Sequence, residues 1–348
     1  MRVAIDTTFA HLGPSGTAVY IERLVEALAA EGADVVELRQ PLRRRRGGRN
    51  KALSAANAAL DLAWTRELLP RAAARAEADV LHHPLPVCSP GPIAQVVTVH
   101  DVAFARRPDD FDPLWRRYAL RNHRAAVARA DAVVAVSRTT ARDAVSWLRV
   151  APERVVVAPH GPGQALSALE RRAPEHFLYV GDAEPRKNVP GLVAAHASYS
   201  DDGGGLPLVL AGASADAVDM GDEYRRRAQP AVIGRPDPSS AALAELYAGA
   251  AALVHASHEE GFGLTVLEAM AAGTPVIATR NAAIEELTNG AALIVELDGL
   301  AGAMLRIERD AALREQLATA GRERAAAFSW QRSARAHIEA YTLARNSP

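Results

Sequence analysis

The sequence contains very little cysteine and lysine. Cys88 is the single cysteine among 348 residues, so an intramolecular disulfide is excluded and the chain suits a reducing compartment. We interpret Cys88 as a small packing side chain rather than a reactive one. Among 40 basic residues only Lys51 and Lys187 are lysine. Lys187 therefore stands out as a candidate for a role of its own.

The sequence also lacks a strong charge imbalance and long apolar runs. Its net charge is −1, so the broad positive field of a nucleic-acid-binding protein is not expected. No run approaches the roughly 20 apolar residues that a membrane-spanning helix needs. Met1 and Arg2 lead directly into the apolar Val3–Ile5 without the apolar core of a signal peptide. We therefore expect a cytoplasmic protein without a membrane span.

One stretch, residues 252–279, reads ALVHASHEEGFGLTVLEAMAAGTPVIAT. It places an apolar segment, a glycine-containing loop, a short helical segment and a second apolar segment in succession. That order predicts a strand, loop, helix and strand, which form one crossover unit of a parallel sheet. With a length that suits two domains, the chain is expected to be an α/β protein.

The loop and helix start of this stretch can bind an anion. Gly261 and Gly263 lack a Cβ and allow a ligand to approach the backbone. A helix beginning at Thr265 would offer its first amides, which have no intrahelical partner, and its dipole to a phosphate. Glu260 at the strand end and Glu268 in the first helical turn would then converge on the same ligand.

A purely structural interpretation of Glu268 also stays open. Thr265 and Glu268 have the spacing of a capping box, in which Glu268 would accept a hydrogen bond from the backbone amide of Thr265 and contact no ligand. The two residues alone favour this interpretation. The longer string in which they lie favours a ligand.

The string EGFGLTVLEAMAAGTPVIAT resembles the donor-site signature of the retaining glycosyltransferase family 4, whose enzymes have two Rossmann-like domains in the GT-B fold. In that family two glutamates with this spacing bind the donor sugar and the nucleotide ribose, which implies these roles for Glu260 and Glu268. The resemblance implies that the backbone between them contacts the donor, at Gly261, Phe262, Gly263, Leu264, Thr265 and Val266. Thr265 stands where the family often has proline.

Two further segments carry the resemblance. RKN at 186–188 matches the family's diphosphate-binding position, which assigns Lys187 to phosphate with Arg186 as a helper. Many relatives also have an arginine directly after the preceding glycine, whereas this chain has Asp182. HDVAFARRPDDFDPLWRRY begins with His100 at the expected end of a strand. The resemblance places His100 beside the donor sugar, although a locally bonded histidine is the ordinary interpretation of such a position.

The loop after the first strand contains Gly13 and Gly16, which do not form GxGxxG, so a dinucleotide-dependent dehydrogenase is weakly supported. The resemblance implies that Gly16 contacts acceptor or phosphate, with a turn glycine as the alternative. The run Arg43, Arg44, Arg45 and Arg46 has two interpretations: a solvated loop, or contact with an anionic acceptor or an anionic membrane surface.

No metal site is expected. Asp110 and Asp112 spell a D-x-D motif, which metal-dependent glycosyltransferases of another fold use, but here the motif precedes an expected helix at 114–129. We interpret these acids as residues of a helix start. Ser137 is likewise expected to cap a helix.

The whole chain is expected to have the GT-B fold, with two Rossmann-like parallel-sheet domains facing across a cleft. We expect an acceptor domain at 1–163, a linker at 164–174, a donor domain at 175–330, and a C-terminal helix at 331–348 that packs back on the first domain. Strands are expected at 3–5, 79–82, 94–99, 132–136, 155–157, 177–180, 206–210, 231–233, 253–255, 276–277, 281–286 and 291–295. Gly234 and Arg235 are expected at a strand end or in a turn.

The motif order implies a retaining, metal-independent glycosyltransferase of the hexosyltransferase type. Its donor would be a nucleotide-sugar, UDP- or GDP-linked, its acceptor a hydroxyl group, and no cofactor would be needed. His100, Glu260 and Lys187 are the expected catalytic residues. Two alternatives remain: a GT-B nucleotide-sugar epimerase or hydrolase, and a non-catalytic nucleotide-binding protein.

Overall fold

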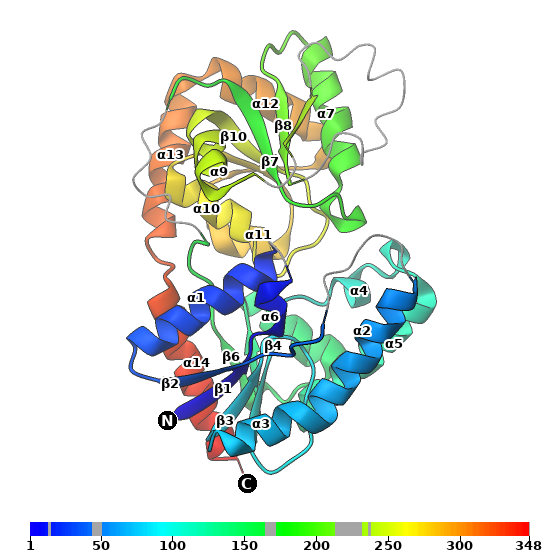
Figure 1. Cartoon of the computed structure of the whole chain (residues 1–348). Helices are drawn as coiled ribbons and strands as arrows, with labels where there is room; N and C mark the ends of the chain where they lie inside the picture. The colour runs from blue at the N-terminus through cyan, green and yellow to red at the C-terminus, as the bar shows by residue number, and fades with distance from the viewer. Residues whose placement is uncertain (13–14, 44–50, 164–171, 213–231, 236–237, 348) are drawn as a thin grey trace. The chain divides into compact units, whose positions relative to one another are not determined.

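In a computed structural model of the chain, the described residues are 1–12, 15–43, 51–163, 172–212, 232–235 and 238–347 (Figure 1). The chain divides into two compact units. Unit 1 comprises Met1–Gly161 and Ser329–Pro348, and unit 2 comprises Pro162–Phe328. The expected linker at 164–174 lies mostly outside the described residues.

Unit 1 is an α/β unit whose last helix comes from the C-terminal end of the chain. Its elements are β1 (Arg2–Asp6), η1 (Thr8–His11), α1 (Gly16–Ala30), β2 (Asp34–Leu38), α2 (Lys51–Ala63), η2 (Trp64–Leu68), α3 (Leu69–Arg75), β3 (Val80–His83), β4 (Ala94–Val99), α4 (Ala103–Arg106), η3 (Pro108–Asp110), α5 (Pro113–Arg129), β5 (Ala132–Ala135), α6 (Arg138–Asp143), η4 (Ala144–Leu148), η5 (Pro152–Arg154), β6 (Val155–Val157) and α14 (Trp330–Arg345).

The sheet of unit 1 is parallel, with the strand order β2-β1-β3-β4-β5-β6. Val3 in β1 lies opposite Val35 in β2 and Val80 in β3. Because the chain runs outward from β1 to β2 and then returns to β3 on the other side of β1, the connections diverge between β1 and β3. In open α/β sheets the carboxyl ends of the strands at such a switch point form a ligand-binding crevice.

The C-terminal helix α14 belongs to the core of unit 1. It contacts α1, β4, β5 and β6, and its Trp330 and Tyr341 lie in one apolar cluster with Val3, Ile5 and Leu24 (Figure 1). The expected return of the C-terminal helix to the first domain is therefore what the structure shows. Gly161 lies so close to this helix that a Cβ would come within 2.5 Å of the Trp330 amide nitrogen.

Buried polar side chains also connect α14 to the sheet. His337 Nδ1 donates to the Ser333 carbonyl over 2.7 Å, so in the neutral ring Nε2 accepts the Tyr20 hydroxyl hydrogen over 2.8 Å. Tyr20 has then used its hydrogen, and its oxygen accepts from the Thr98 hydroxyl at 2.8 Å.

The same order of donor and acceptor continues on the other side of Thr98. Its oxygen accepts from His82 Nε2 at 2.9 Å, and His82 Nδ1 accepts from the Tyr341 hydroxyl at 2.9 Å. All these side chains are buried. We call this directional series, Tyr341, His82, Thr98, Tyr20, His337 and Ser333, the histidine–tyrosine chain. It begins and ends on α14 and passes through β3, β4 and α1.

Unit 2 is a second α/β unit. Its described elements are β7 (His176–Val180), η6 (Pro185–Lys187), α7 (Val189–Asp201), β8 (Leu208–Ala211), β9 (Val232–Arg235), α9 (Ser240–Gly249), β10 (Ala250–His255), α10 (Leu264–Ala272), β11 (Val276–Thr279), α11 (Ala282–Thr288), β12 (Leu293–Val295), η7 (Leu297–Gly299), α12 (Leu300–Arg309) and α13 (Ala311–Ala325). Its parallel sheet has the order β12-β11-β10-β7-β8-β9. Read from β9, this is the Rossmann strand order, with the switch point between β7 and β10.

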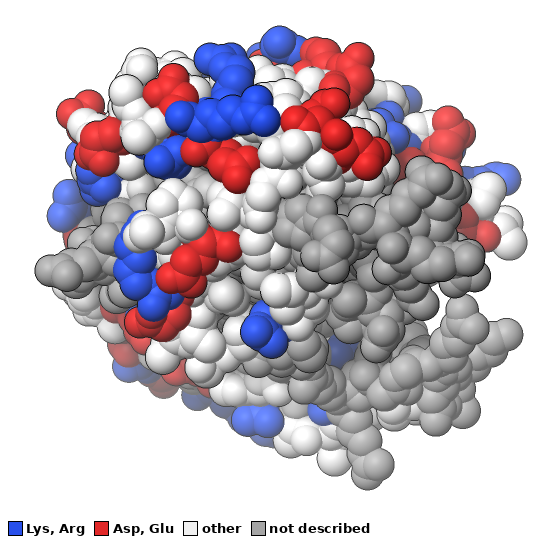
Figure 2. Space-filling model, turned by 90° about the horizontal axis from the view of Figure 1, so that it is seen from above, with Lys and Arg blue, Asp and Glu red and all other residues white. Residues whose placement is uncertain are grey.

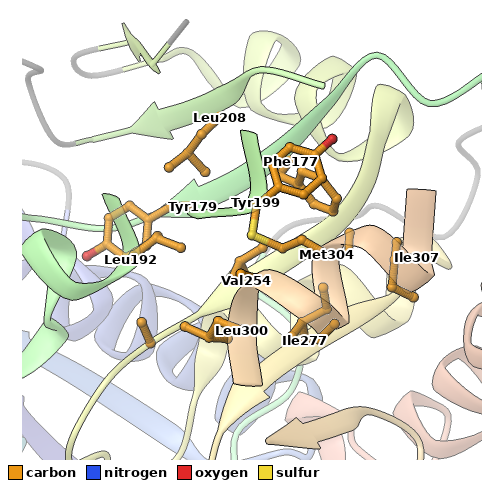
Figure 3. Close-up of a cluster of buried hydrophobic side chains, with 14 of the residues drawn as sticks. Phe177, Tyr179, Leu192, Tyr199, Leu208, Val254, Ile277, Leu300, Met304 and Ile307 are labelled. Carbon is orange, nitrogen blue, oxygen red and sulfur yellow. The ribbon is translucent and has the colours of Figure 1, made fainter. Parts of the chain in front are cut away.

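The core of unit 2 lies between its sheet and the helices α7 and α12. Figure 3 shows Leu192 and Tyr199 of α7 with Leu300, Met304 and Ile307 of α12, packed against strand residues that include Phe177, Leu208, Val254 and Ile277. Burial of these apolar side chains fixes the strands. The strand ends, where the loops begin, are held in place by this core.

One expected strand of unit 2 is wrong. Residues 281–286 do not form a strand: Asn281 caps α11 by accepting hydrogen bonds from the amides of Ala283 and Ile284, as short polar side chains do before a helix. Gly234 and Arg235 are the last two residues of β9, at the edge of the sheet, so they lie at a strand end, one of their two expected positions. The remaining expected strands overlap observed ones.

Charges of both signs are interspersed on the face of the molecule drawn in Figure 2, as far as its residues are described. This agrees with the net charge of −1. In the described part of the chain, no helix has both the length and the apolar character that spanning a membrane requires.

Candidate functional site

The candidate site of unit 2 lies at the switch point of its sheet, where β7 and β10 are neighbours. The loop after β7 leads through Gly181 into the short helix η6, which ends at Lys187. The loop after β10 runs from Ala256 to Gly263 and ends where α10 begins. Both loops leave the carboxyl edge of the sheet, so their side chains meet there.

Lys187 and Glu260 form the centre of this site. Lys187 Nζ lies 2.5 Å from Glu260 Oε1, and Arg186 Nη1 lies 3.2 Å from Glu260 Oε2. The Arg186 guanidinium also contacts the exposed Glu184 at 2.9 Å. Glu260 lies in the loop that follows His255, the last residue of β10, as expected for a residue beyond the carboxyl end of this strand. The structure thus brings together Lys187, Arg186 and Glu260, three of the expected site residues.

A histidine that sequence analysis missed completes the surroundings of Glu260. His255 Nε2 lies 3.3 Å from Glu260 Oε1, and both side chains are buried. Burial alone would raise the pKa of Glu260, but Lys187, His255 and Arg186 outweigh it and hold the pKa well below its usual range. Glu260 is therefore a carboxylate. The signal for His255 was its position as the last residue of β10.

Beyond Glu260 the chain reaches the amino end of α10. Gly263 precedes the helix with φ of 100°, a left-handed conformation, and a Cβ there would come within 2.5 Å of Ile284 Cδ1. Glycine is thus required at this position for two reasons. The helix begins at Leu264 rather than at Thr265, and no side chain caps it. The amides of Leu264, Thr265 and Val266 are the first of the helix and lack intrahelical acceptors.

The structure shows that Glu268 is not the acid of a capping box. It lies in the second turn of α10 rather than the first, only 4% exposed, and its Oε2 accepts a hydrogen bond from the Tyr247 hydroxyl over 3.0 Å. Tyr247, in α9, had no signal in the sequence. Burial raises the pKa of Glu268 to about 7, although the Tyr247 hydrogen bond acts in the opposite direction.

The remaining donor-loop residues are largely buried. Gly261 is buried, and Phe262 packs edge-on against Phe328 with ring centroids 5.9 Å apart. Asp182 stands where many relatives have arginine; it is exposed, and its carbonyl accepts from the Tyr179 hydroxyl over 2.8 Å.

His100 and Gly16 belong to unit 1. His100 follows β4, its Nε2 donates to the Pro84 carbonyl over 2.8 Å, and its ring lies edge-on to Tyr20 at 4.8 Å. Gly16 is the first residue of α1, after the cap Ser15, rather than part of a loop; a Cβ there would meet nothing within 4 Å. Gly13 lies outside the described residues.

Of the four arginines at 43–46, the structure describes only Arg43. Arg43 is not a solvated or membrane-facing residue: its side chain is 7% exposed, its Nε lies 2.7 Å from Asp61 Oδ1, and its guanidinium covers the Phe9 ring at 4.5 Å. Arg44, Arg45 and Arg46 lie outside the described residues.

The D-x-D motif serves local structure. Asp112 caps α5 by accepting hydrogen bonds from the amides of Leu114 and Trp115, and Asp110 pairs with Arg107. Ser137 caps α6, as expected, by accepting from the Thr140 amide over 2.9 Å. Within the described ranges, no group of three or more His, Cys, Asp or Glu side chains is arranged to hold a metal ion.

Comparison with known proteins agrees with this geometry. A family model described as Glycosyltransferase Family 4 matches residues 14–161, and one described as Glycosyl transferases group 1 matches residues 167–324. The O-antigen chain mannosyltransferase B of Escherichia coli is 27% identical over 270 residues, which are 71% of this chain and 70% of that protein. The chain spans 54 to 59% of the next three curated relatives that it matches.

Two solved structures share the fold over almost their full length. Sucrose-phosphate synthase from Thermosynechococcus elongatus has a TM-score of 0.77 at 22% identity, with 98% of each chain covered. Anabaena HepE in complex with UDP-glucose has a TM-score of 0.68 at 16% identity, with 97% of this chain and 98% of that chain covered. The family models cover both halves of the sequence, and both sheets are Rossmann-like: the chain belongs to glycosyltransferase family 4 and has the GT-B fold.

Proposed function

We propose that this glycosyltransferase moves a sugar from a UDP- or GDP-sugar to a hydroxyl acceptor, with retention of anomeric configuration and without a metal. The observation that carries the proposal is the contact of Lys187 and Arg186 with Glu260 at the switch point of unit 2, four residues before Leu264, the first residue of α10. This places fixed positive charge, helix amides and a carboxylate at one sheet edge, which are the groups that a sugar diphosphate requires.

Each group has a separate task. The leaving nucleoside diphosphate gains negative charge, and Lys187 with the amides of Leu264–Val266 stabilises it in place of a metal ion. Glu260 accepts hydrogen bonds from hydroxyls of the donor sugar and so orients its anomeric carbon. Lys187 then lies between two groups: the Glu260 carboxylate, which positions the donor sugar, and the diphosphate, which departs from that sugar.

Glu268 is assigned to the ribose hydroxyls and His100 to the donor sugar. The Tyr247 hydroxyl donates to one acceptor position of the Glu268 carboxylate. The other acceptor positions of this carboxylate are available to a hydroxyl donor. The assignment of His100 rests on the family resemblance and on its position after β4.

The reaction needs no protein nucleophile. The bond from the anomeric carbon to the diphosphate oxygen breaks, and the bond from that carbon to the acceptor oxygen forms on the same face. The acceptor's proton passes to the departing diphosphate. In the retaining mechanism that the family resemblance implies, the leaving group itself serves as the base.

A nucleotide screen followed by an activity assay tests the proposal. Thermal shifts with UDP, GDP, ADP and TDP identify the base, and the matching nucleotide-sugars are then incubated with and without hydroxyl acceptors, in EDTA. We expect one nucleotide to stabilise the protein and an α- or β-product of unchanged configuration to form in EDTA. Consumption of the donor without an acceptor would instead indicate an epimerase or hydrolase, and binding without any turnover a non-catalytic protein.

A cytoplasmic location with peripheral contact to an anionic membrane is the second part of the proposal. Arg43 is used within unit 1, so the contact rests on the sequence of Arg44, Arg45 and Arg46 alone. Sedimentation with vesicles that contain anionic lipid tests it. No binding at low salt would end this part of the proposal and leave the enzymatic part intact.

A further inference from the structure

Three side chains contact the Glu260 carboxylate in the described part of the chain. Lys187 Nζ lies 2.5 Å from Oε1, Arg186 Nη1 lies 3.2 Å from Oε2, and His255 Nε2 lies 3.3 Å from Oε1. Lys187 and Arg186 belong to η6, in the loop after β7 that the proposed function assigns to the diphosphate. His255 is the last residue of β10 and has no task in that function.

The two cations gain a competing partner when a donor binds. The diphosphate of a nucleotide-sugar carries more negative charge than the single carboxylate of Glu260. Because Coulomb attraction grows with charge, Lys187 and Arg186 are drawn from the carboxylate toward the diphosphate. A carboxylate that orients the donor sugar must not move with them, since orientation is its contribution to the reaction. Glu260 therefore needs a partner that stays in place.

The backbone of His255 is held by the sheet. His255 lies opposite Ala278 in the pairing of β10 with β11. The Thr279 hydroxyl donates to the Ser257 carbonyl over 3.1 Å, which holds the start of the following loop against the end of β11. The His255 side chain is itself only 3% exposed. Its ring is thus fixed by the strand on which it lies and does not depend on the loop after β7.

The His255 ring presents a hydrogen to Glu260. A carboxylate oxygen only accepts hydrogen bonds and would repel a lone pair on Nε2 at 3.3 Å, so the hydrogen lies on Nε2. The Ser257 hydroxyl oxygen lies 3.4 Å from the same nitrogen. On the other side of the ring, Nδ1 has no hydrogen-bond partner among the described residues. An apolar ring would avoid this unpaired buried nitrogen, so the contact at Nε2 explains why a histidine stands here.

These contacts leave one oxygen of Glu260 open. A carboxylate offers about four acceptor positions, shared equally between its oxygens. Lys187 and His255 contact Oε1, whereas Arg186 alone contacts Oε2. The remaining acceptor position of Oε2 is available to a hydroxyl of the donor sugar.

We propose that His255 is a positioning residue for Glu260. Its Nε2 holds Oε1 while Lys187 and Arg186 contact the diphosphate, so that Oε2 stays directed at a hydroxyl of the donor sugar. This role rests on the proposed function, in which Glu260 binds that sugar. His255 is therefore expected to matter for the sugar part of the donor and not for its nucleotide part.

Calorimetry with matched pairs of ligands tests this role. The pairs are UDP with UDP-glucose and GDP with GDP-mannose, without an acceptor. The quantity compared is the Kd of the nucleotide-sugar divided by the Kd of the nucleoside diphosphate, for the pair that wild type binds. We expect His255→Phe to raise this ratio about tenfold, because the carboxylate loses its fixed partner while the diphosphate keeps both cations. His255→Gln, whose amide can still donate to Oε1, should stay within about threefold of wild type.

His196→Phe is the matched structural control. His196 is another buried histidine of unit 2, in α7, and its Nε2 lies 3.0 Å from the Leu206 carbonyl oxygen. Its replacement removes a buried hydrogen bond, so it should lower the melting temperature and leave the ratio unchanged. A wild-type ratio in His255→Phe, or an equal rise in His196→Phe, would overturn the role of His255. A ratio in His255→Gln as high as that in His255→Phe would overturn it as well.

A second test needs no donor. Lys187→Ala imitates the movement of Lys187 away from Glu260 and leaves Arg186 and His255 as contacts of the carboxylate. We expect His255→Phe to lower the melting temperature more in the Lys187→Ala background than in wild type, because the buried charge then has less compensation. Equal decreases in the two backgrounds would show that His255 does not hold Glu260.

The outcomes distinguish this role from the proposed function. Failure of wild type to bind either pair would contradict the proposed donor, and the unfolding comparison would still decide whether His255 holds Glu260. Binding of a nucleotide-sugar without transfer to any acceptor would contradict the proposed reaction, and the Kd ratios would still decide the role of His255.

Discussion

The Tyr247 hydroxyl donates to the Glu268 carboxylate over 3.0 Å, and both side chains are buried. This contact joins α9 to α10 directly behind the amino end of α10. Because burial raises the pKa of Glu268 to about 7, its charge changes near neutral pH. The residue that the family resemblance assigns to the ribose is thus also a source of pH dependence.

Glu268→Gln is expected to change how stability depends on pH. The folded-state pKa is about 7 and the ordinary value is 4.5, so between these values the folded protein binds more protons and its stability falls as pH rises. Above pH 7 the full penalty, about 3 kcal/mol, is present. The glutamine variant lacks this penalty. Urea unfolding from pH 4.5 to 8 should show a smaller decline for Glu268→Gln than for wild type, and parallel curves would contradict the raised pKa.

The same variant tests the ribose assignment. A glutamine can still accept the Tyr247 hydrogen bond, but it accepts a ribose hydroxyl less strongly than a carboxylate does. We expect Glu268→Gln to weaken nucleotide binding in calorimetry at pH 8, with the difference shrinking toward pH 6. Tyr247→Phe is the control that removes the hydrogen bond between Tyr247 and Glu268 and keeps the carboxylate. Unchanged affinity in Glu268→Gln would make Glu268 a structural residue.

Lys187→Ala is expected to reduce turnover by about 100-fold, because one donor to the departing diphosphate is lost. The variant should also lose stability, since Glu260 is buried against Lys187. The loss should remain below the about 3–5 kcal/mol of a fully isolated buried charge, because Arg186 and His255 still contact Glu260. Steady-state kinetics and thermal unfolding on the same samples measure both effects.

A double variant separates these two effects. Glu260→Gln in the Lys187→Ala background removes the buried charge and should recover part of the melting temperature without recovering turnover. A melting temperature no higher than that of Lys187→Ala alone would show that the unpaired Glu260 carboxylate is not the source of the lost stability.

The site of unit 2 was predictable where backbone geometry forces the residue type. Gly263 needs φ of 100° beside Ile284, and a glycine followed by an apolar helical segment signals such a turn. Lys187 and Glu260 were assigned from motifs 73 positions apart, and the sheet's switch point explains why they meet. The ligand roles of these residues remain predictions.

Other features could not be predicted, because they depend on packing between distant segments. Tyr247 reaches Glu268 from a different helix, and His255 acquires its role only when the loop after β10 folds over it. The sequence after Asn281 has features of both a strand and a helix. Asn281 accepts hydrogen bonds from the first amides of α11 and so favours the helix. Arg43 stands in a run typical of solvated loops, yet Asp61 and Phe9 bury it.

Gly263→Ala is expected to destabilise unit 2 by more than about 1 kcal/mol, because alanine strains at positive φ and its Cβ meets Ile284. The matched control is Gly302→Ala in α12, where a Cβ meets nothing within 4 Å. That change should stabilise the protein by about 0.5–1 kcal/mol, because alanine favours helix. Denaturant unfolding compares the two, and equal effects would contradict the assigned backbone constraint.

Tyr341→Phe is expected to weaken the attachment of α14 to unit 1. It removes the donor to His82 Nδ1 at one end of the histidine–tyrosine chain and leaves a buried nitrogen without a partner, at a cost of about 1–3 kcal/mol in the free energy of unfolding. The control, Tyr118→Phe, changes a side chain that is 67% exposed and should cost less than about 0.5 kcal/mol.

Thermal unfolding at pH 7.5 keeps His337 neutral, since burial lowers its pKa to about 4. Below pH 6.5 both variants and wild type should lose stability, because the unfolded chain then binds protons that the buried histidines of the folded state do not. Equal melting temperatures of Tyr341→Phe and Tyr118→Phe at pH 7.5 would show that the hydrogen bond to His82 contributes nothing to holding α14.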